Sequence, residues 1–318
     1  MSIAAMAAPS WLAPVLQLRW FIAAAWMAAI VYVHRRGVVR HRFRRQLLDH
    51  SSLTAPINVV LYASSAVPAQ PLLDLQDFPE LKILRDHWRE IRDEAARLYG
   101  IGGIGRSDGL NDLGFNSFFK KGWGRFYFHW YGRFLPSALR ECPRTCELLR
   151  QVPGVKAAMF TLLAPGSRLP LHRDPFAGSL RYHLGLITPN SDACRLIVDG
   201  RTYAWRDGED VLFDETYIHT AENKTDQTRI ILFCDVERPL NNPLARVFNR
   251  FIGRTLAAAS ASRNEAGEPL GALNHLFRYL YSIRIVGKKL KAWNQPVYYL
   301  IKYALFASIL GALLWRRH

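Results

Sequence analysis

The stretch that decides the fold is Ser179–Ile187, which reads SLRYHLGLI. Because successive side chains of an extended chain point to opposite faces, Arg181 and His183 fall on one face of this segment. The apolar residues fall on the other face: Leu180, Tyr182, Leu184 and Leu186. The pattern predicts a β-strand with one face packed in a core and one face that carries polar groups.

Further short runs of strand character are separated by turn signals such as Pro-Gly, Asp-Gly and Pro-Asn. They are residues 125–130, 157–163, 194–198, 211–213 and 228–236. Short strands with such turns predict an antiparallel sandwich or barrel. One helix is expected ahead of them, over residues 78–99, because apolar side chains recur there at three- and four-residue spacing, and the glycine-rich residues 100–114 end it.

A candidate metal site consists of His172, Asp174 and His219. His172 and Asp174 lie two positions apart, so both side chains of an extended segment can reach one ion. Two imidazoles and one carboxylate on one face of a metal leave positions open, as in non-haem Fe(II) oxygenases. A lone His-x-Asp is more often a surface or turn element, so this assignment needs support from other residues.

That support comes from Arg229, which opens a strand that is apolar as far as Asp235. A guanidinium at the start of such a strand needs an anionic partner, and a carboxylate offers matching bidentate geometry. Together with Arg181 and His183, it indicates a site for a dicarboxylate that also chelates the metal.

The charge of the 318-residue chain is concentrated at its two ends. The formal net charge is +16, of which residues 1–50 carry +6 and residues 241–318 carry +10. The 190 residues between them hold 23 basic and 23 acidic side chains. A neutral middle disfavours a nucleic-acid-binding core, and a hydrophobic fraction of 50% excludes a disordered tail.

Both ends contain long apolar runs, over residues 11–33 and 297–315. A helix of about 20 residues is long enough to cross a bilayer, and the arginines after the first run would keep their side in the cytoplasm. We therefore expect membrane helices at both ends, with interfacial amphipathic helices as the alternative. The expected units are residues 1–50 (membrane helix and basic segment), 51–240 (catalytic domain), 241–296 (basic-aromatic helices) and 297–318 (membrane helix).

At this point the ordered motifs resemble a known family. They are Thr161, Pro165-Gly166, His172-Arg173-Asp174-Pro175, the Arg181-to-Leu186 run, Phe213-Asp214, His219, Arg229 and Asp235-Val236. Over residues 78–239 the chain resembles the aspartyl/asparaginyl β-hydroxylases, a family of 2-oxoglutarate dioxygenases. It looks most like the bacterial lipid A 2-hydroxylase branch, since the protein-hydroxylating enzymes typically carry glycine at the position of Asp174.

The resemblance implies a double-stranded β-helix, of jelly-roll or cupin type, that holds Fe(II) on His172, Asp174 and His219. It further implies that Arg229, assisted by Thr161, binds the far carboxylate of 2-oxoglutarate. Arg181 and His183 would contact the same co-substrate.

With O2, the implied reaction hydroxylates the 2-position of a lipid A acyl chain and releases succinate and CO2. The implied location is the bacterial inner membrane, with the catalytic domain facing the cytoplasm, an anionic lipid as partner and no nucleic acid. The alternatives are hydroxylation of Asp or Asn in a protein, hydroxylation of another acyl lipid such as an ornithine lipid, and a catalytically silent membrane scaffold that binds metal.

Overall fold

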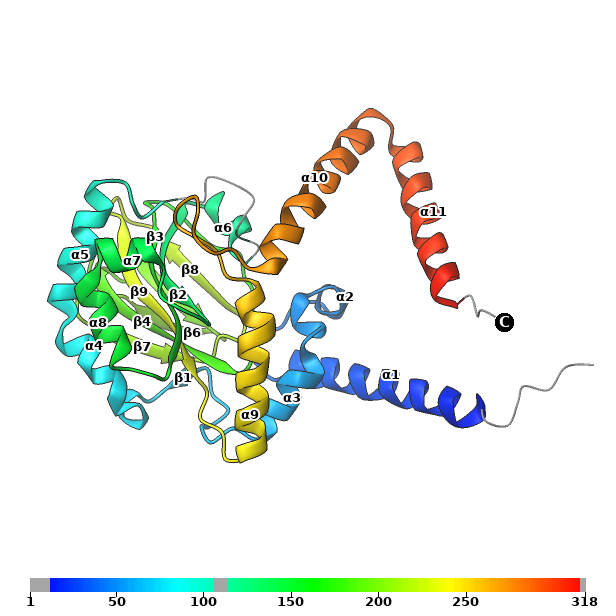
Figure 1. Cartoon of the computed structure of the whole chain (residues 1–318), viewed down its shortest axis with the longest axis horizontal. Helices are drawn as coiled ribbons and strands as arrows, with labels where there is room; N and C mark the ends of the chain where they lie inside the picture. The colour runs from blue at the N-terminus through cyan, green and yellow to red at the C-terminus, as the bar shows by residue number, and fades with distance from the viewer. Residues whose placement is uncertain (1–11, 106–111, 113, 315–318) are drawn as a thin grey trace, which may run out of the picture.

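The computed structural model describes residues 12–105, 112 and 114–314 of the chain (Figure 1). Its strands are β1 Leu72–Leu73, β2 Trp123–Trp130, β3 Val155–Leu163, β4 Ser179–Ile187, β5 Cys194–Val198, β6 Arg201–Ala204, β7 Asp210–Phe213, β8 His219–Asn223 and β9 Arg229–Glu237. They form a six-stranded antiparallel sheet of order β1-β7-β4-β9-β3-β2 and a three-stranded sheet of order β6-β5-β8.

From β4 onward the chain alternates between the two sheets. Strands β4, β7 and β9 belong to the larger sheet, and the intervening β5, β6 and β8 belong to the smaller one. Apolar side chains of both sheets share one buried core. This winding is a double-stranded β-helix, so the predicted mainly β jelly-roll core is confirmed, although strands β6 and β8 were not expected from the sequence.

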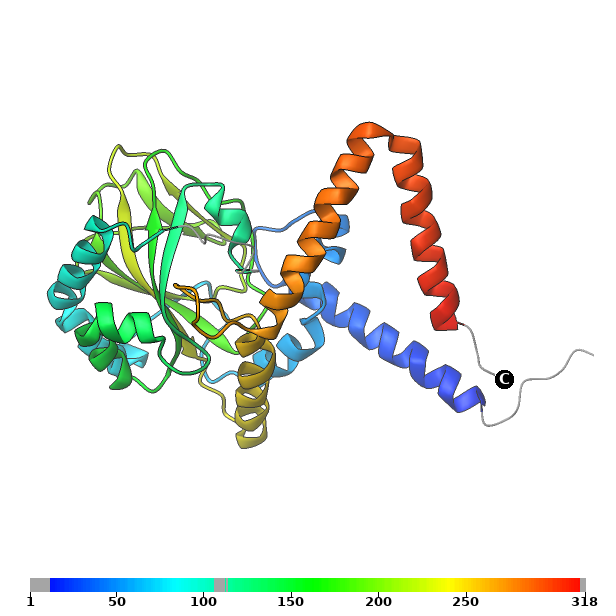
Figure 2. The same ribbon diagram turned by 45° about the horizontal axis from the view of Figure 1, so that its top comes forward.

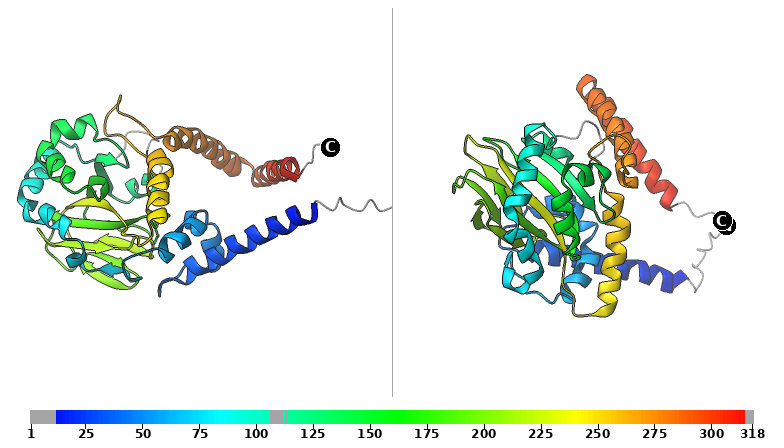
Figure 3. Two further views of the ribbon diagram at one scale, coloured as in Figure 1. Left: turned by 60° about the horizontal axis from the view of Figure 1, so that its bottom comes forward. Right: turned by 60° about the vertical axis from the view of Figure 1, so that its left-hand side comes forward.

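Helices cover the outer face of the larger sheet. They are α4 Lys82–Asp86, α5 Trp88–Gly100, α7 Pro136–Glu141 and α8 Pro143–Arg150 (Figures 1 and 3). Helix α5 packs on β4 through a buried stripe formed by Ile91, Ala95 and Leu98. The predicted alternation of β4 is therefore realised, with Tyr182 and Leu184 in the core and Arg181 and His183 on the opposite, cavity-lining face.

The prediction of one continuous helix over residues 78–99 is wrong. The segment forms a 3₁₀ turn at Pro79–Leu81 and then α4 and α5, separated at His87. His87 adopts φ −104° and ψ 21°, and its ring Nδ1 donates to the Ile83 carbonyl at 2.9 Å. The same carbonyl accepts the His87 backbone N–H, so the side chain competes with the helical hydrogen bond at the break.

Apart from the short helix α6, which precedes β2, the remaining helices lie towards the two ends of the chain. They are α1 Leu12–Arg35, α2 Phe43–Leu47, α3 Ala55–Ala63, α6 Asn116–Phe119, α9 Pro243–Ile252, α10 Ala272–Trp293 and α11 Gln295–Leu314, with 3₁₀ turns at His50–Ser52 and Leu75–Asp77 and a π turn at Gly253–Ala257. Helices α1, α10 and α11 extend from the same side of the β domain (Figures 1 and 2). They confirm helical structure in both apolar runs.

In the described ranges, however, no helix combines the length and apolarity needed to cross a membrane. The expected spanning segments are thus not supported. The outer ends of the two apolar runs, Trp11 and Trp315, lie outside the described residues.

A buried ion cluster attaches the N-terminal segment to the β domain. Arg36, directly after α1, and Arg238, directly after β9, donate to the same Asp214 oxygen at 2.6 and 2.7 Å. All three side chains are almost fully buried, and the Arg36 guanidinium also lies 3.8 Å from the centre of the Tyr62 ring. The carboxylate at the end of β7 therefore ties α1 to β9.

We expect Asp214→Ala to lower the free energy of unfolding by about 3–5 kcal/mol, because two buried guanidinium groups would lose their carboxylate. Burial raises the pKa of Asp214, but Arg238 and Arg36 outweigh it and hold the pKa below the ordinary aspartate range. The stabilisation is therefore full above the pKa of an unfolded aspartate and is lost progressively as the pH falls below about 4. Denaturation of the full chain at pH 7 and at pH 3 measures both effects.

Asp86→Ala is the control for this experiment, since Asp86 forms only an exposed ion pair with Lys82. That variant should unfold like the parent at both pH values. Equal stability of the Asp214 and Asp86 variants at pH 7 would contradict the assigned role of the cluster.

Candidate active site

The backbone pairs His172 directly with His219. His172 lies in the segment before β4, His219 begins β8, and the two residues exchange backbone hydrogen bonds of 3.0 and 2.7 Å. This pairing sets the two rings side by side, with centroids 4.2 Å apart. The structure thus brings together two histidines that are distant in sequence, as the metal-site prediction requires.

Backbone carbonyls fix the orientation of both imidazoles. The Nδ1 of His172 donates to the Pro170 carbonyl at 2.8 Å, and the Nδ1 of His219 donates to the Tyr217 carbonyl at 3.0 Å. A carbonyl can only accept, so in the neutral rings each Nε2 keeps a lone pair for a metal. Burial lowers the pKa of both histidines, that of His219 to about 3, which favours these neutral rings.

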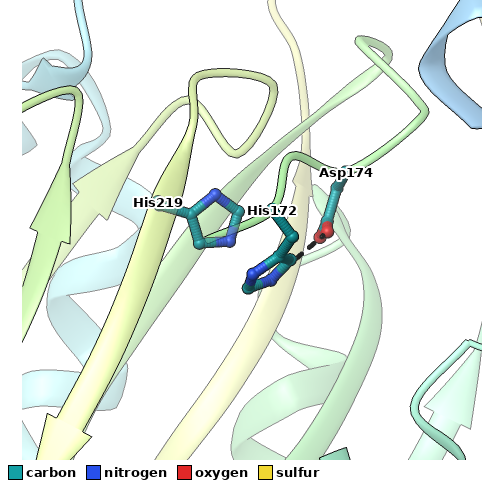
Figure 4. A group of neighbouring side chains, drawn as sticks. All are labelled: His172, Asp174 and His219. Carbon is teal, nitrogen blue, oxygen red and sulfur yellow. Dashed lines mark ion pairs between the residues drawn. The ribbon is translucent and has the colours of Figure 1, made fainter. Parts of the chain in front are cut away.

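Asp174 completes the group, as Figure 4 shows. One ligand atom from each of the three residues lies within 4.8 Å of the others, and His172 Nε2 is 3.9 Å from Asp174 Oδ1. Burial raises the pKa of Asp174, but the adjacent Arg181 guanidinium outweighs this effect, and the pKa lies at about 2. Two neutral imidazoles and one ionised carboxylate fit a divalent cation such as Fe(II) and leave other positions on the ion open.

Arg181 supports this group from β4. Its Nη2 lies 2.8 Å from Asp174 and 2.7 Å from Glu215, and its Nε donates to Asp235 at 2.8 Å. The guanidinium is buried and stacks 3.8 Å from the centre of the Phe233 ring. The observed role of Arg181 is therefore to orient Asp174, whereas its implied contact with 2-oxoglutarate stays a prediction.

Glu215 and Asp235 were not recognised as site residues from the sequence. Burial raises the pKa of Glu215, and the negative charges of Asp235 and Asp174 add to the increase. The direction of this shift favours protonation of Glu215, which would limit the excess negative charge around Arg181. Tyr131 extends the network by donating to Asp235 at 3.2 Å. Asp235 belongs to the motifs of the resemblance, but no pattern assigns it or Glu215 to Arg181, because their contacts with Arg181 arise only from the tertiary fold.

Arg229 is a buried cation in the same cavity, but it has a different environment. No carboxylate lies within ion-pair distance in the described part of the chain, and its Nε has no hydrogen-bond partner there. The guanidinium lies 4.4 Å from the centre of the Trp205 ring, and burial lowers its pKa to about 10, so it stays charged near neutral pH. A buried charge without a partner is costly, and a ligand carboxylate would satisfy it.

Two more predicted residues lie where a carboxylate ligand would need them. Thr161 on β3 lines the cavity with Arg229, and both ring nitrogens of the buried His183 lack a partner among the described residues. An unpaired guanidinium, a threonine and an imidazole beside a metal-ligand group fit 2-oxoglutarate, which carries one carboxylate at each end.

The cavity that contains these groups has aromatic and aliphatic walls. Its lining consists of Phe115, Phe118, Trp123, Thr161, Leu169, His172, Asp174, Arg181, His183, Leu196, Phe213, His219, Ala221, Arg229 and Phe233. The Phe118 ring packs 4.8 Å from His172, and the Phe115 ring stacks on Trp123 at 4.8 Å. Phe115 and Phe118 were missed by the sequence analysis, since they follow the glycine-rich stretch and share no pattern with the strands.

Comparison with known proteins agrees with this site. The sequence model of the family described as aspartyl/asparaginyl beta-hydroxylase matches residues 85–239. The chain is 40% identical over 128 residues to an ornithine lipid ester-linked acyl 2-hydroxylase from Rhizobium tropici, covering 40% of this chain and 45% of that protein. It is 28% identical over 195 residues to the human aspartyl/asparaginyl beta-hydroxylase, covering 58% and 25%.

The chain thus spans less than half the length of these two relatives. Among solved structures, a Pseudomonas putida prolyl-4-hydroxylase is 17% identical, with 48% of this chain and 87% of that chain covered, at a TM-score of 0.34. That score is too low to add to the topology seen directly. The family match and the residues of the site agree with each other: residues 85–239 form a domain of the aspartyl/asparaginyl β-hydroxylase family.

Proposed function

We propose that the chain is an Fe(II)- and 2-oxoglutarate-dependent dioxygenase that hydroxylates the 2-position of an acyl chain in a membrane lipid. The observation that carries the proposal is that one cavity holds a His-Asp-His group and the buried Arg229, which has no carboxylate partner among the described residues. When bound, Fe(II), 2-oxoglutarate and O2 supply an oxidation that replaces a C–H bond beside the acyl carbonyl by C–OH, with release of succinate and CO2.

The residues of the chain would contribute binding, orientation and exclusion of water. His172, Asp174 and His219 would hold the metal, and Arg181 would keep Asp174 in place. Arg229 and Thr161 would bind the far carboxylate of 2-oxoglutarate, with His183 beside it. The apolar cavity wall formed by Phe115, Phe118, Leu169 and Leu196 would exclude water and accept hydrocarbon.

Two lipids are candidate carriers of the acyl chain. The sequence motifs favour lipid A, because Asp174 replaces the glycine of the protein hydroxylases. The Rhizobium tropici relative favours an ornithine lipid, because its name specifies that substrate. Both lipids present an acyl carbonyl next to the carbon to be hydroxylated, so the same site chemistry serves either one.

We also propose that the protein lies on the cytoplasmic face of a bacterial inner membrane. Helix α1 exposes a run of large apolar side chains: Leu18, Trp20, Phe21 and Ile22. Helix α10 exposes Leu276, Tyr279, Ile283 and Val286 and carries Lys288, Lys289 and Lys291 towards its end. Apolar and aromatic side chains beside cations suit an interface rich in anionic lipid.

Lipid mass spectrometry tests the function. Expression of the parent chain in a bacterial host should add one oxygen to an acyl chain of lipid A or of an ornithine lipid. His172→Ala, Asp174→Ala and His219→Ala should each abolish this gain, because each removes a metal ligand. His275→Ala is the control, since His275 is an exposed histidine of α10, and it should retain the activity.

A gain of oxygen in the His219→Ala variant would refute the metal site. Succinate release that depends on an Asp- or Asn-containing peptide, without any lipid product, would favour protein hydroxylation instead. Parent protein that binds neither Fe(II) nor 2-oxoglutarate would favour the silent scaffold.

Steady-state kinetics test the assignment of Arg229. Arg229→Ala should raise the KM for 2-oxoglutarate by roughly 10- to 100-fold, because a hydrogen bond to a charged group contributes about 1.5–3 kcal/mol. Arg195→Ala removes an arginine of strand β5 that pairs with Glu222 of strand β8, and it should leave that KM unchanged. An unchanged KM in Arg229→Ala would place the co-substrate carboxylate elsewhere.

A further inference from the structure

The loop that carries two of the three metal ligands has little support of its own. Residues 171–178, between β3 and β4, belong to no helix or named strand. Within the β domain, this loop is held by the His172–His219 backbone pair and by the Asp174 amide, which donates to the Glu215 carbonyl at 2.9 Å. Its end is held by Arg238, whose backbone N–H and Nε donate to the Gly178 and Ala177 carbonyls. The carbonyls of Leu171, Arg173 and Pro175 and the Ala177 N–H have no partner in the described part of the β domain and need partners from elsewhere.

Several of those partners come from the N-terminal segment, residues 33–58. Arg45 Nη2 donates to the Leu171 carbonyl at 3.0 Å. His50 Nε2 donates to the Arg173 carbonyl at 2.9 Å, and Arg173 Nη1 donates in return to the Val33 carbonyl, at the end of α1, at 2.7 Å. The loop is thus bonded to the N-terminal segment on either side of His172.

Asn58 of α3 makes the most complete of these contacts. Its Nδ2 donates to the Pro175 carbonyl at 2.9 Å, and its Oδ1 accepts the Ala177 N–H at 2.9 Å. The side chain is fully buried, and Thr54 donates to the same Pro175 carbonyl. One amide therefore bonds the backbone immediately after Asp174 at two points, as a neighbouring strand would.

We propose that Asn58, assisted by Thr54, is a positioning residue of the metal site, an inference that rests on the proposed function. Asn58 lies outside residues 85–239, the part matched by the family model. It fixes the backbone that follows Asp174, while Arg181 fixes the carboxylate, so backbone and side chain of one ligand are held separately. The N-terminal segment is thereby part of the site and not only an attachment.

Metal affinity tests this role, since loss of a group that orients a ligand typically weakens metal binding by about 10- to 100-fold. The full chain, its Asn58→Ala variant and its Asn274→Ala variant are titrated with Mn(II) alone by calorimetry. Asn274 is a matched control: it is a fully buried asparagine of α10 whose Nδ2 bonds two backbone carbonyls, at Ser260 and Ala261. Both variants lose a buried amide, but only Asn58→Ala should lose affinity by about tenfold or more.

Amide hydrogen exchange of the metal-free protein gives a second readout. Exchange of the Ala177 N–H should accelerate in Asn58→Ala and stay slow in Asn274→Ala. Unchanged Mn(II) affinity in Asn58→Ala, or an equal loss in both variants, would overturn the proposal. If Asn58→Ala does not fold, Thr54→Val decides the question: weaker Mn(II) binding supports the proposal, and unchanged binding overturns it.

The outcome also separates this inference from the proposed function. A parent protein that fails to bind Mn(II) refutes the metal site itself, and the positioning role with it. If the parent protein binds Mn(II) and the Asn58→Ala variant binds it with equal affinity, only the positioning role is refuted.

Discussion

The site depends on which carboxylates neutralise the charges of its buried arginines. Arg181 has Asp174, Glu215 and Asp235 around it, so its charge is met within the protein and becomes a means of holding a metal ligand. Arg229, in the same cavity, has no carboxylate among the described residues. A buried guanidinium without a counter-ion lowers the stability of the fold, and a bound anion at Arg229 would remove this destabilisation.

The double-stranded β-helix makes this contrast possible. Antiparallel pairing of β4 with β9 sets Arg181 of β4 opposite Asp235 of β9. Arg229 lies at the other end of β9. The backbone pair between His172 and His219 then brings the metal ligands to the cavity that those strands line. One sheet therefore presents two cations to the same cavity: Arg181, which pairs with carboxylates, and Arg229, which has no carboxylate partner among the described residues.

Much of this could be predicted from local patterns. Alternation along Ser179–Ile187 identified both faces of β4, and the two-residue spacing of His172 and Asp174 identified ligands on one side of an extended segment. The contacts of Arg181 could not be predicted, because Asp235 meets it only across the β4–β9 pair and Glu215 meets it from the turn after β7. The short strands β6 and β8 were also missed. The four-residue, partly exposed β6 has no apolar periodicity, and β8 is buried although its sequence, HTAEN, is mostly polar.

The ends of the chain were harder to predict. Composition located the positive charge and the apolar runs, but it gave no indication that residues 33–58 bond the metal-ligand loop. Those contacts join polar side chains to backbone carbonyls more than 100 positions away, and hydrogen bonds of that kind leave no periodic trace in a sequence.

The central claim, that metal ligands and an unpaired arginine form one site for 2-oxoglutarate, is tested most directly by equilibrium binding. Purified full-length chain is dialysed anaerobically against 2-oxoglutarate with and without Mn(II). The account predicts one 2-oxoglutarate per chain when Mn(II) is present and much weaker binding without it, because the metal and Arg229 each hold one end. Binding that is equally strong without Mn(II), or no binding in its presence, would contradict the account.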